Sequence, residues 1–147
     1  MLQKYQSLVH STIPLTQYMK WSILTLSEFE ITTSTQLAPN INVHGTGFAG
    51  SIYAAAMATG WTLLKCWYDQ HHYNTELVAA EANIKYFKPV NENFTCQASL
   101  SSDSEQYQKL VKRLDNNKSC GFKQKVELLC NGEVCAKLTV SFVFKCS

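Results

Sequence analysis

The chain has 147 residues, of which 46% are hydrophobic and 16% are charged, and its formal net charge is +2. This length and composition suit one folded domain with a sizeable core and exclude a disordered chain. The small net charge and the lack of a Lys- or Arg-rich run or an RNA-binding aromatic pattern argue against nucleic acid as a partner.

The cysteine usage indicates a reducing compartment. Six cysteines occur, but no two form a C-x-x-C pair, so we expect no metal site. Residues 1–14 are expected to form a polar amphipathic helix and lack the apolar core of a signal peptide. We therefore expect free thiols in a cytoplasmic protein, with disulfides as the alternative in an oxidising compartment.

The first third of the chain predicts a helix followed by extended structure. Apolar residues at helical spacing predict a helix over residues 2–12, which Pro14 ends. Apolar and β-branched residues from Trp21 to Leu37 predict extended strand. The alternation slips near Ser27, so we expect a bend or bulge there. Ala38-Pro39-Asn40 then marks a loop.

A polar, glycine-rich loop runs directly into an uncharged helical segment in the middle of the chain. No charged residue occurs from Gly45 to Leu64, and we expect the central helix over about residues 49–67. A helix that is hydrophobic all round must be buried on most sides. A membrane span is the alternative for a run of this length. Its glycines, threonines and serine, and the soluble-sheet pattern of the remaining chain, argue against a span.

The second half predicts two strands, a surface helix and two final strands. Alternation predicts strands over Glu76–Val90 and Asn93–Ser101, with Pro89 ending the first at a sheet edge. The run Ser102–Glu105 has capping-box spacing ahead of an amphipathic surface helix over about residues 104–115. The final strands are expected over Phe122–Leu129 and Glu133–Lys145.

The register of the final hairpin can be predicted from its apolar residues, which occupy even positions in both strands. A two-residue Asn-Gly turn would pair even with odd positions, and such a slip moves a whole set of side chains to the wrong face. We therefore predict a three-residue loop, Cys130–Gly132, with Gly132 left-handed and Leu128 opposite Val134. This register puts Cys135 on the solvent side and disfavours a cross-strand disulfide.

The order of elements indicates an α+β protein. No long helix links each successive pair of strands, so a parallel βαβ arrangement is excluded. An antiparallel sheet that curls around the buried helix fits best. Because one small sheet covers only about half the circumference of such a helix, we expect a second subunit to cover the rest.

The start of the central helix is the first candidate for function. The first N–H groups of a helix have no partner within it and carry the positive end of its dipole. Near Phe48 and Ala49 they could polarise a carbonyl and stabilise the oxyanion that forms on attack. The simpler alternative is a glycine-rich turn that is needed only for tight packing.

The loop and helix start carry the motif Asn42-x-x-Gly45-Thr46-x-Phe48-x-Gly50-Ser51, and the later strand reads Ile84-x-Tyr86-x-Lys88-Pro89-Val90. Together these motifs resemble those of hotdog-fold thioesterases. From Met19 to Phe144 the chain most resembles the thioesterase family often found C-terminal to an acetyltransferase domain. The resemblance implies the hotdog fold, a curved antiparallel sheet wrapped around a long central helix, in homodimers or dimers of dimers.

The resemblance also implies hydrolysis of an acyl-CoA or acyl-carrier-protein thioester at the dimer interface, near the helix start, without a cofactor or a metal. Asn42 would orient the attacking water, or else only hold the loop. His44 would act as general base, or else be a structural residue. The N–H groups of Phe48 and Ala49 would hold the oxyanion. The remaining candidates, all for substrate binding, are Gly45, Thr46, Gly47, Gly50, Ser51, Tyr53, Met57 and Lys88.

Lys88, with Lys85, would meet the phosphates of CoA, or else lie on a solvated strand face. Two departures from related subfamilies concern the chemistry. Those subfamilies have a His-Gly-Gly turn where this chain has Phe48-Ala49-Gly50. They also have an acid two turns along the helix, where this chain has Met57. A carboxylate would then have to come from elsewhere, and the candidates in a partner subunit are Glu76, Glu81 and Asp69.

The missing acid leaves a second function open, a non-catalytic acyl-thioester-binding or interaction module of the same fold. A dehydratase would need a His and acid pair, which the sequence does not supply.

Overall fold

A six-stranded antiparallel sheet and one long helix form the body of the protein. The computed structural model describes residues 1–147. The elements in chain order are α1 (Leu2–Thr12), α2 (Leu15–Tyr18), β1 (Trp21–Leu26), β2 (Glu30–Thr35), the 3-10 turn η1 (Ala38–Asn40), α3 (Ala49–Gln70), β3 (Thr75–Tyr86), β4 (Phe94–Ser99), α4 (Glu105–Asp115), β5 (Cys120–Cys130) and β6 (Glu133–Cys146). The strand order is β1-β2-β4-β5-β6-β3, so β1 and β3 form the two edges.

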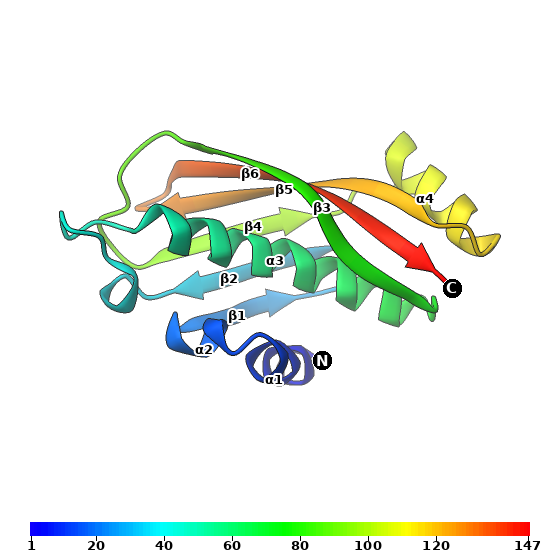
Figure 1. The fold of residues 1–147 in the computed structure, drawn as a ribbon, viewed down its shortest axis with the longest axis horizontal. Coiled ribbons are helices and arrows are strands. Elements are labelled where there is room, and N and C mark those ends of the chain that lie inside the picture. The colour runs from blue at the N-terminus through cyan, green and yellow to red at the C-terminus, as the bar shows by residue number, and fades with distance from the viewer.

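The central helix lies along one face of the sheet, as Figure 1 shows, with α1 and α2 beside the β1 edge. Helix α4 lies at the upper right of this view, next to β5. Helix α3 begins at Ala49 and continues to Gln70, three residues beyond the expected Trp67. The helix extends past Trp67 because Trp67 and Tyr68 are both buried, and their packing stabilises its last turn. No helix is both long and apolar enough to span a membrane.

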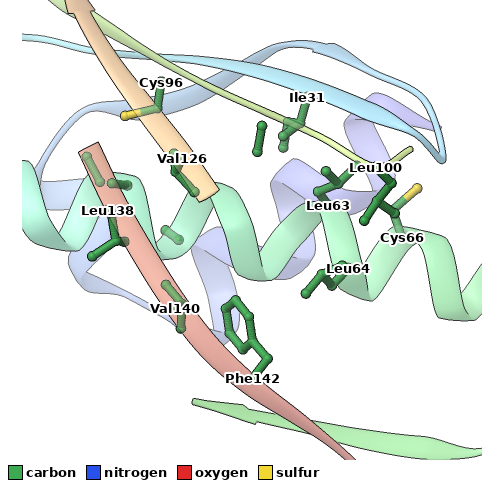
Figure 2. Packing of buried hydrophobic residues seen from close by; sticks show 14 of the residues in the cluster. Ile31, Leu63, Leu64, Cys66, Cys96, Leu100, Val126, Leu138, Val140 and Phe142 are labelled. Atoms are coloured by element: carbon green, nitrogen blue, oxygen red, sulfur yellow. The ribbon is translucent and has the colours of Figure 1, made fainter. Parts of the chain in front are cut away.

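The core lies between α3 and the concave face of the sheet, where side chains from β2, β4, β5 and β6 point toward the helix (Figure 2). Every second residue of β5 from Cys120 to Cys130 is buried, which is the period of a strand with one covered face. Gly60 permits close contact of α3 with β5, because a Cβ there would lie 3.0 Å from Cγ2 of Val126.

A buried hydroxyl cluster joins α3 to the first hairpin. The Oγ1 atom of Thr59 bonds to the carbonyl oxygen of Ala55 at 2.8 Å and accepts from Nε1 of Trp21 at 3.2 Å. It also lies 2.7 Å from Oγ1 of Thr33. These polar groups are all buried, so each depends on the others for its hydrogen bonds.

The final hairpin differs from its prediction in the position of the extra residue. Asn131 and Gly132 both have positive φ, 55° and 74°, and form a two-residue turn in which Cys130 pairs with Glu133. The predicted three-residue loop and the pairing of Leu128 with Val134 are therefore wrong. Gly132 is left-handed, as expected.

The even positions still face each other, because a bulge restores the register. The pairing shifts beyond Leu129–Val134, and Leu128 lies opposite Ala136. Cys135 is the extra residue, and it is 3% exposed rather than on the solvent side. A bulge accommodates one unpaired residue without moving the following side chains to the other face. All six cysteines are free.

Three further boundaries differ from the sequence-based expectation. The expected strand from Trp21 to Leu37 is a hairpin, which turns at Ser27 and has a register shift beside Leu24. Strand β3 ends at Tyr86, before Pro89. The cap of α4 is Ser104, whose Oγ accepts from the N–H of Tyr107 at 3.1 Å.

Candidate active site at the start of the central helix

The loop before α3 is a closed turn held by backbone hydrogen bonds. The N–H of Asn42 donates to the carbonyl of Thr46 at 2.7 Å, and the N–H of Gly45 donates back to the carbonyl of Asn42 at 3.1 Å. Gly45 has a φ of +76°, a conformation that side chains disfavour, so glycine suits this position. Val43, at the tip, is 95% exposed. The loop is therefore a preformed structure with an apolar tip.

The side chain of Asn42 is fully used inside this turn. Its Oδ1 accepts from the N–H of His44 at 2.8 Å and from the N–H of Thr46 at 3.2 Å. Its Nδ2 donates to Oγ1 of Thr46 at 2.9 Å and to the carbonyl of Gly47 at 3.3 Å. An amide whose two ends are both occupied has little capacity left to orient water. The geometry therefore favours the role in which Asn42 holds the loop. The Thr46 hydroxyl is also occupied, because it bonds to the Asn42 amide.

His44 lies exposed beside the loop tip, and its imidazole makes no hydrogen bond with the chain. A general base needs a partner or a packing contact to hold its ring in place. Only the backbone N–H of His44 contacts Asn42. The proposal that His44 acts as a base is therefore supported by the chemistry of imidazole and by no contact of its ring.

The first turn of α3 presents three free N–H groups. Phe48 is the N-cap residue, with extended backbone and no side-chain cap. Its own N–H donates to the carbonyl of Asn40 at 2.7 Å, so the expected free donor at Phe48 is wrong. The N–H groups of Ala49, Gly50 and Ser51 make no hydrogen bond within the chain. They lie at the positive end of a 22-residue helix, which favours a carbonyl oxygen or an oxyanion.

The glycines of the motif set the packing around these donors. A Cβ at Gly50 would lie 2.6 Å from the ring of Phe48, so the ring rests over Gly50. At Gly47 a Cβ would lie 3.1 Å from both Ile52 and Val90. The N–H of Gly47 also donates to the carbonyl of Val90 at 2.7 Å. Tight packing and free donors thus occur together at this helix start.

Tyr86 is a neighbour of the site that the sequence did not single out as a functional residue. Its hydroxyl donates to the carbonyl oxygen of Ala49 at 2.9 Å. Burial raises the pKa of the Tyr86 hydroxyl, and the nearby Tyr53 adds to this. The one available sequence signal was its place in the strand motif that ends at Val90.

The candidate charged groups lie apart from the donors or are already paired. Asp69 is twenty residues beyond Ala49, about 30 Å along the helix. It accepts from Nζ of Lys65 at 3.0 Å and from the hydroxyl of Tyr5 at 2.9 Å, so it joins α1 to α3. Lys88 contacts Glu133 at 2.9 Å, and both side chains are more than half exposed.

Two of the expected substrate-binding residues, Tyr53 and Met57, line an apolar cavity of about 480 Å³ beside α3. Trp61 lies one turn further along the same helix, and the segment from Ile13 to Met19 and the start of β3 provide the other walls. Thr16 is the one lining residue that is not hydrophobic. This cavity matches the size and polarity of small-molecule sites.

Comparison with known proteins identifies the family. A model of the YiiD_C family, described as "Putative thioesterase (yiiD_Cterm)", matches residues 2–146. A structure described as a "putative thioesterase" from Shewanella oneidensis is 30% identical with a TM-score of 0.87, over 98% of this chain and 96% of that chain.

Two more distant structures share the fold. A Pseudomonas aeruginosa protein described as a "Probable Thioesterase" is 17% identical with a TM-score of 0.86, over 99% and 95% of the two chains. A thioesterase of Haemophilus influenzae is 11% identical with a TM-score of 0.77, over 99% and 91%. The chain has the hotdog fold, and it belongs to the YiiD_C family, whose description is "Putative thioesterase".

Proposed function

We propose that this protein hydrolyses an acyl-CoA or acyl-carrier-protein thioester at the start of α3. The observation that carries the proposal is the set of free N–H groups at Ala49, Gly50 and Ser51, one turn from the apolar cavity. The thioester carbonyl accepts from Ala49 and Gly50, and the acyl group extends toward Tyr53. Negative charge that develops on this oxygen as water attacks is then held by donors already in place. When the oxyanion collapses, the C–S bond breaks, and the thiolate of CoA or of the carrier protein leaves and takes up the proton removed from the water.

The water is activated by a group outside this subunit. Edge strand β3 exposes Val78, Tyr86 and the carboxylates of Glu76 and Glu81. An edge with unpaired backbone groups can pair with the same edge of a second copy. Such a homodimer would cover the open side of α3 and bring one copy's carboxylates near the other copy's helix start. Neither Asn42 nor Met57 can accept the proton of the water, and no hydrogen bond holds the exposed ring of His44 near the donors. We therefore assign the base to a carboxylate from the second copy.

The test is release of free thiol from acyl-CoA by wild type and by Ala49→Pro. Proline removes one N–H donor, and it is well tolerated at the first helical position, because that N–H has no helical partner. The extended backbone of Phe48, with ψ of 130°, is also compatible with a following proline. We expect kcat to fall about a hundredfold to a thousandfold, the effect of losing one oxyanion donor. Ala49→Ser keeps the N–H and is the matched control.

A rate for Ala49→Pro equal to that of wild type would show that the donor assignment is wrong. For the dimer, sedimentation of wild type at micromolar concentration is the check. A monomer that hydrolyses thioesters at full rate would contradict a base supplied by a second copy.

The second candidate function is acyl-thioester binding without hydrolysis. It is favoured by Met57, which points an apolar side chain into the cavity where related subfamilies have an acid. Binding of an S-alkyl-CoA thioether, together with no thiol release from any acyl-CoA, would establish this function instead.

A further inference from the structure

The apolar cavity begins at Tyr53, one turn beyond the candidate site, on the helix face that starts at Ala49. Ala49, Tyr53, Met57, Trp61 and Lys65 are spaced four residues apart, so they lie nearly in a row on one helix face. The row begins at a free N–H donor and passes three cavity-lining side chains. Helix side chains lean toward the N-terminus, so the side chains of Tyr53, Met57 and Trp61 lean toward the donors.

The floor and the opposite wall are also apolar. Ala54 and Ala58 leave a shallow channel beside the row, and Phe142 of β6 lies beneath them. Leu15 and Met19, from the segment around α2, face the row across this channel. Figure 1 shows α3 passing between this segment and β3. A channel with two walls and an apolar floor suits a narrow aliphatic chain.

Trp61 closes the far end of the channel. Its Nε1 donates to the carbonyl of Leu77 on β3 at 3.4 Å, which fixes the indole against the edge strand. The next residue of the row, Lys65, is charged and forms an ion pair with Asp69 at 3.0 Å. An acyl chain therefore finds no apolar contact beyond Trp61, because the indole blocks its path and the next residue of the row is charged.

The length of the channel sets the size of its occupant. From Tyr53 to Trp61 the helix rises about 12 Å, and from Ala49 to Tyr53 about 6 Å. An extended chain of single bonds advances about 3.5 Å for every three bonds. The longer distance therefore corresponds to about ten bonds of an acyl chain, and the shorter one to about five. The backward lean of the Trp61 ring shortens the path somewhat.

We propose that the channel binds the alkyl part of a straight-chain acyl thioester of roughly ten to fourteen carbons, and that Trp61 sets the upper limit. This inference rests on the proposed function, because the occupant is the acyl group of that substrate. It adds the substrate class and a residue that determines chain length. Each methylene placed in the channel is worth about fourfold in kcat/KM, equivalent to about 0.8 kcal/mol.

The experiment compares acetyl-, hexanoyl-, decanoyl-, tetradecanoyl- and octadecanoyl-CoA as substrates. For wild type we expect kcat/KM to rise to a maximum at decanoyl- or tetradecanoyl-CoA and to fall at octadecanoyl-CoA. Trp61→Ala opens the end of the channel and moves the maximum to longer chains. Ala54→Leu fills the channel near its mouth and moves the maximum to shorter chains. Leu24→Ala, an exposed site on β1, is the control and leaves the profile unchanged.

Opposite shifts in two variants cannot come from a general loss of stability. A profile that is flat in wild type, or that does not move in either channel variant, would overturn the inference while leaving hydrolysis intact. Binding of S-alkyl-CoA thioethers, measured by calorimetry, separates the two proposals. If affinity rises with alkyl length and no substrate is hydrolysed, the channel assignment stands and the proposed reaction fails. A change of subunit association in Ala54→Leu without a change in the profile would assign the channel to a second copy instead.

Discussion

The hydroxyl of Tyr86 donates to the carbonyl oxygen of Ala49 at 2.9 Å, so edge strand β3 holds the first residue of the central helix. The two residues are 37 positions apart in sequence. This contact links the strand expected to meet a second subunit with the helix turn that carries the free donors. The position of those donors therefore depends on β3.

Replacing Tyr86 with Phe tests this link. We expect the free energy of unfolding to fall by about 0.5–1 kcal/mol, the lower part of the range for a hydrogen bond, because Tyr86 is nearly half exposed. Thiol release should fall less than tenfold, because the donors remain but are held less firmly. Urea denaturation and acyl-CoA hydrolysis measure the two effects. Tyr18→Phe removes a hydroxyl that is exposed and unbonded, and should change neither value.

Asn42→Ala separates the two roles expected for this residue. The structure shows five hydrogen bonds between its amide and the turn, so we expect a loss of roughly 1–2 kcal/mol of stability. Hydrolysis should fall in proportion to the disorder of the loop, with little change in its pH dependence. Thermal unfolding and a pH–rate profile are the measurements. A large drop in kcat at unchanged stability would show instead that Asn42 acts on the water.

Thr59→Val should destabilise the protein more than its position on a helix suggests. Valine keeps the shape but leaves the indole N–H of Trp21 and the hydroxyl of Thr33 without their partner. An unsatisfied buried polar group costs about 1–3 kcal/mol. Thr62→Val is the matched control, because the equally buried Thr62 hydroxyl bonds only the carbonyl of Ala58, at 2.6 Å. Equal losses in the two variants, measured by urea denaturation, would contradict a cooperative role for the Thr59 cluster.

Stability should decline at alkaline pH because of buried thiols. Burial raises the pKa of Cys66 to about 11 and that of Cys96 to about 12, from an ordinary 9.0. Above pH 9.0 the unfolded thiols ionise while the folded ones stay protonated, so stability is complete below that pH and falls as the pH rises toward the folded values. Each thiol contributes a slope of at most about 1.4 kcal/mol per pH unit.

Cys96→Ala isolates one of these contributions. It lowers the stability at neutral pH through a small cavity, but its stability should fall less steeply above pH 9.0. Urea denaturation at a series of alkaline pH values is the measurement. An unchanged slope would show that Cys96 does not titrate differently in the two states.

Local sequence patterns determine some features of this fold, and tertiary contacts determine others. The amphipathic face of α4 and the alternation of β5 follow from local period, and both are readable from sequence. The bulge at Cys135 is not, because a loop residue and a strand bulge restore register equally well. The bulge lets the Cys135 carbonyl accept from the N–H groups of Phe87 and Lys88, at 2.7 and 3.2 Å, which is a tertiary contact.

The candidate site shows the same division. Free N–H groups at a helix start could be predicted from the glycine-rich loop. The sequence could not show which of these groups is free. The N–H of Phe48 donates to the carbonyl of Asn40, in a turn whose path depends on packing. Tyr86 was missed for a similar reason, since its contact with Ala49 joins two elements distant in sequence. The wall from Ile13 to Met19 also comes from a distant segment.

The bulge at Cys135 has a consequence for how this protein tolerates change. The Cys135 carbonyl accepts hydrogen bonds from the N–H groups of Phe87 and Lys88. The carbonyl of Val90 accepts from the N–H of Gly47, which lies just before the helix turn that carries the free N–H groups. Every hydrogen bond in this series joins main-chain atoms, so no bond in the series is lost merely because a side chain outside Gly47 is replaced. A single-residue insertion or deletion in the hairpin would instead shift its register and displace the donors. The length of the last hairpin is therefore under tighter constraint than its amino-acid composition.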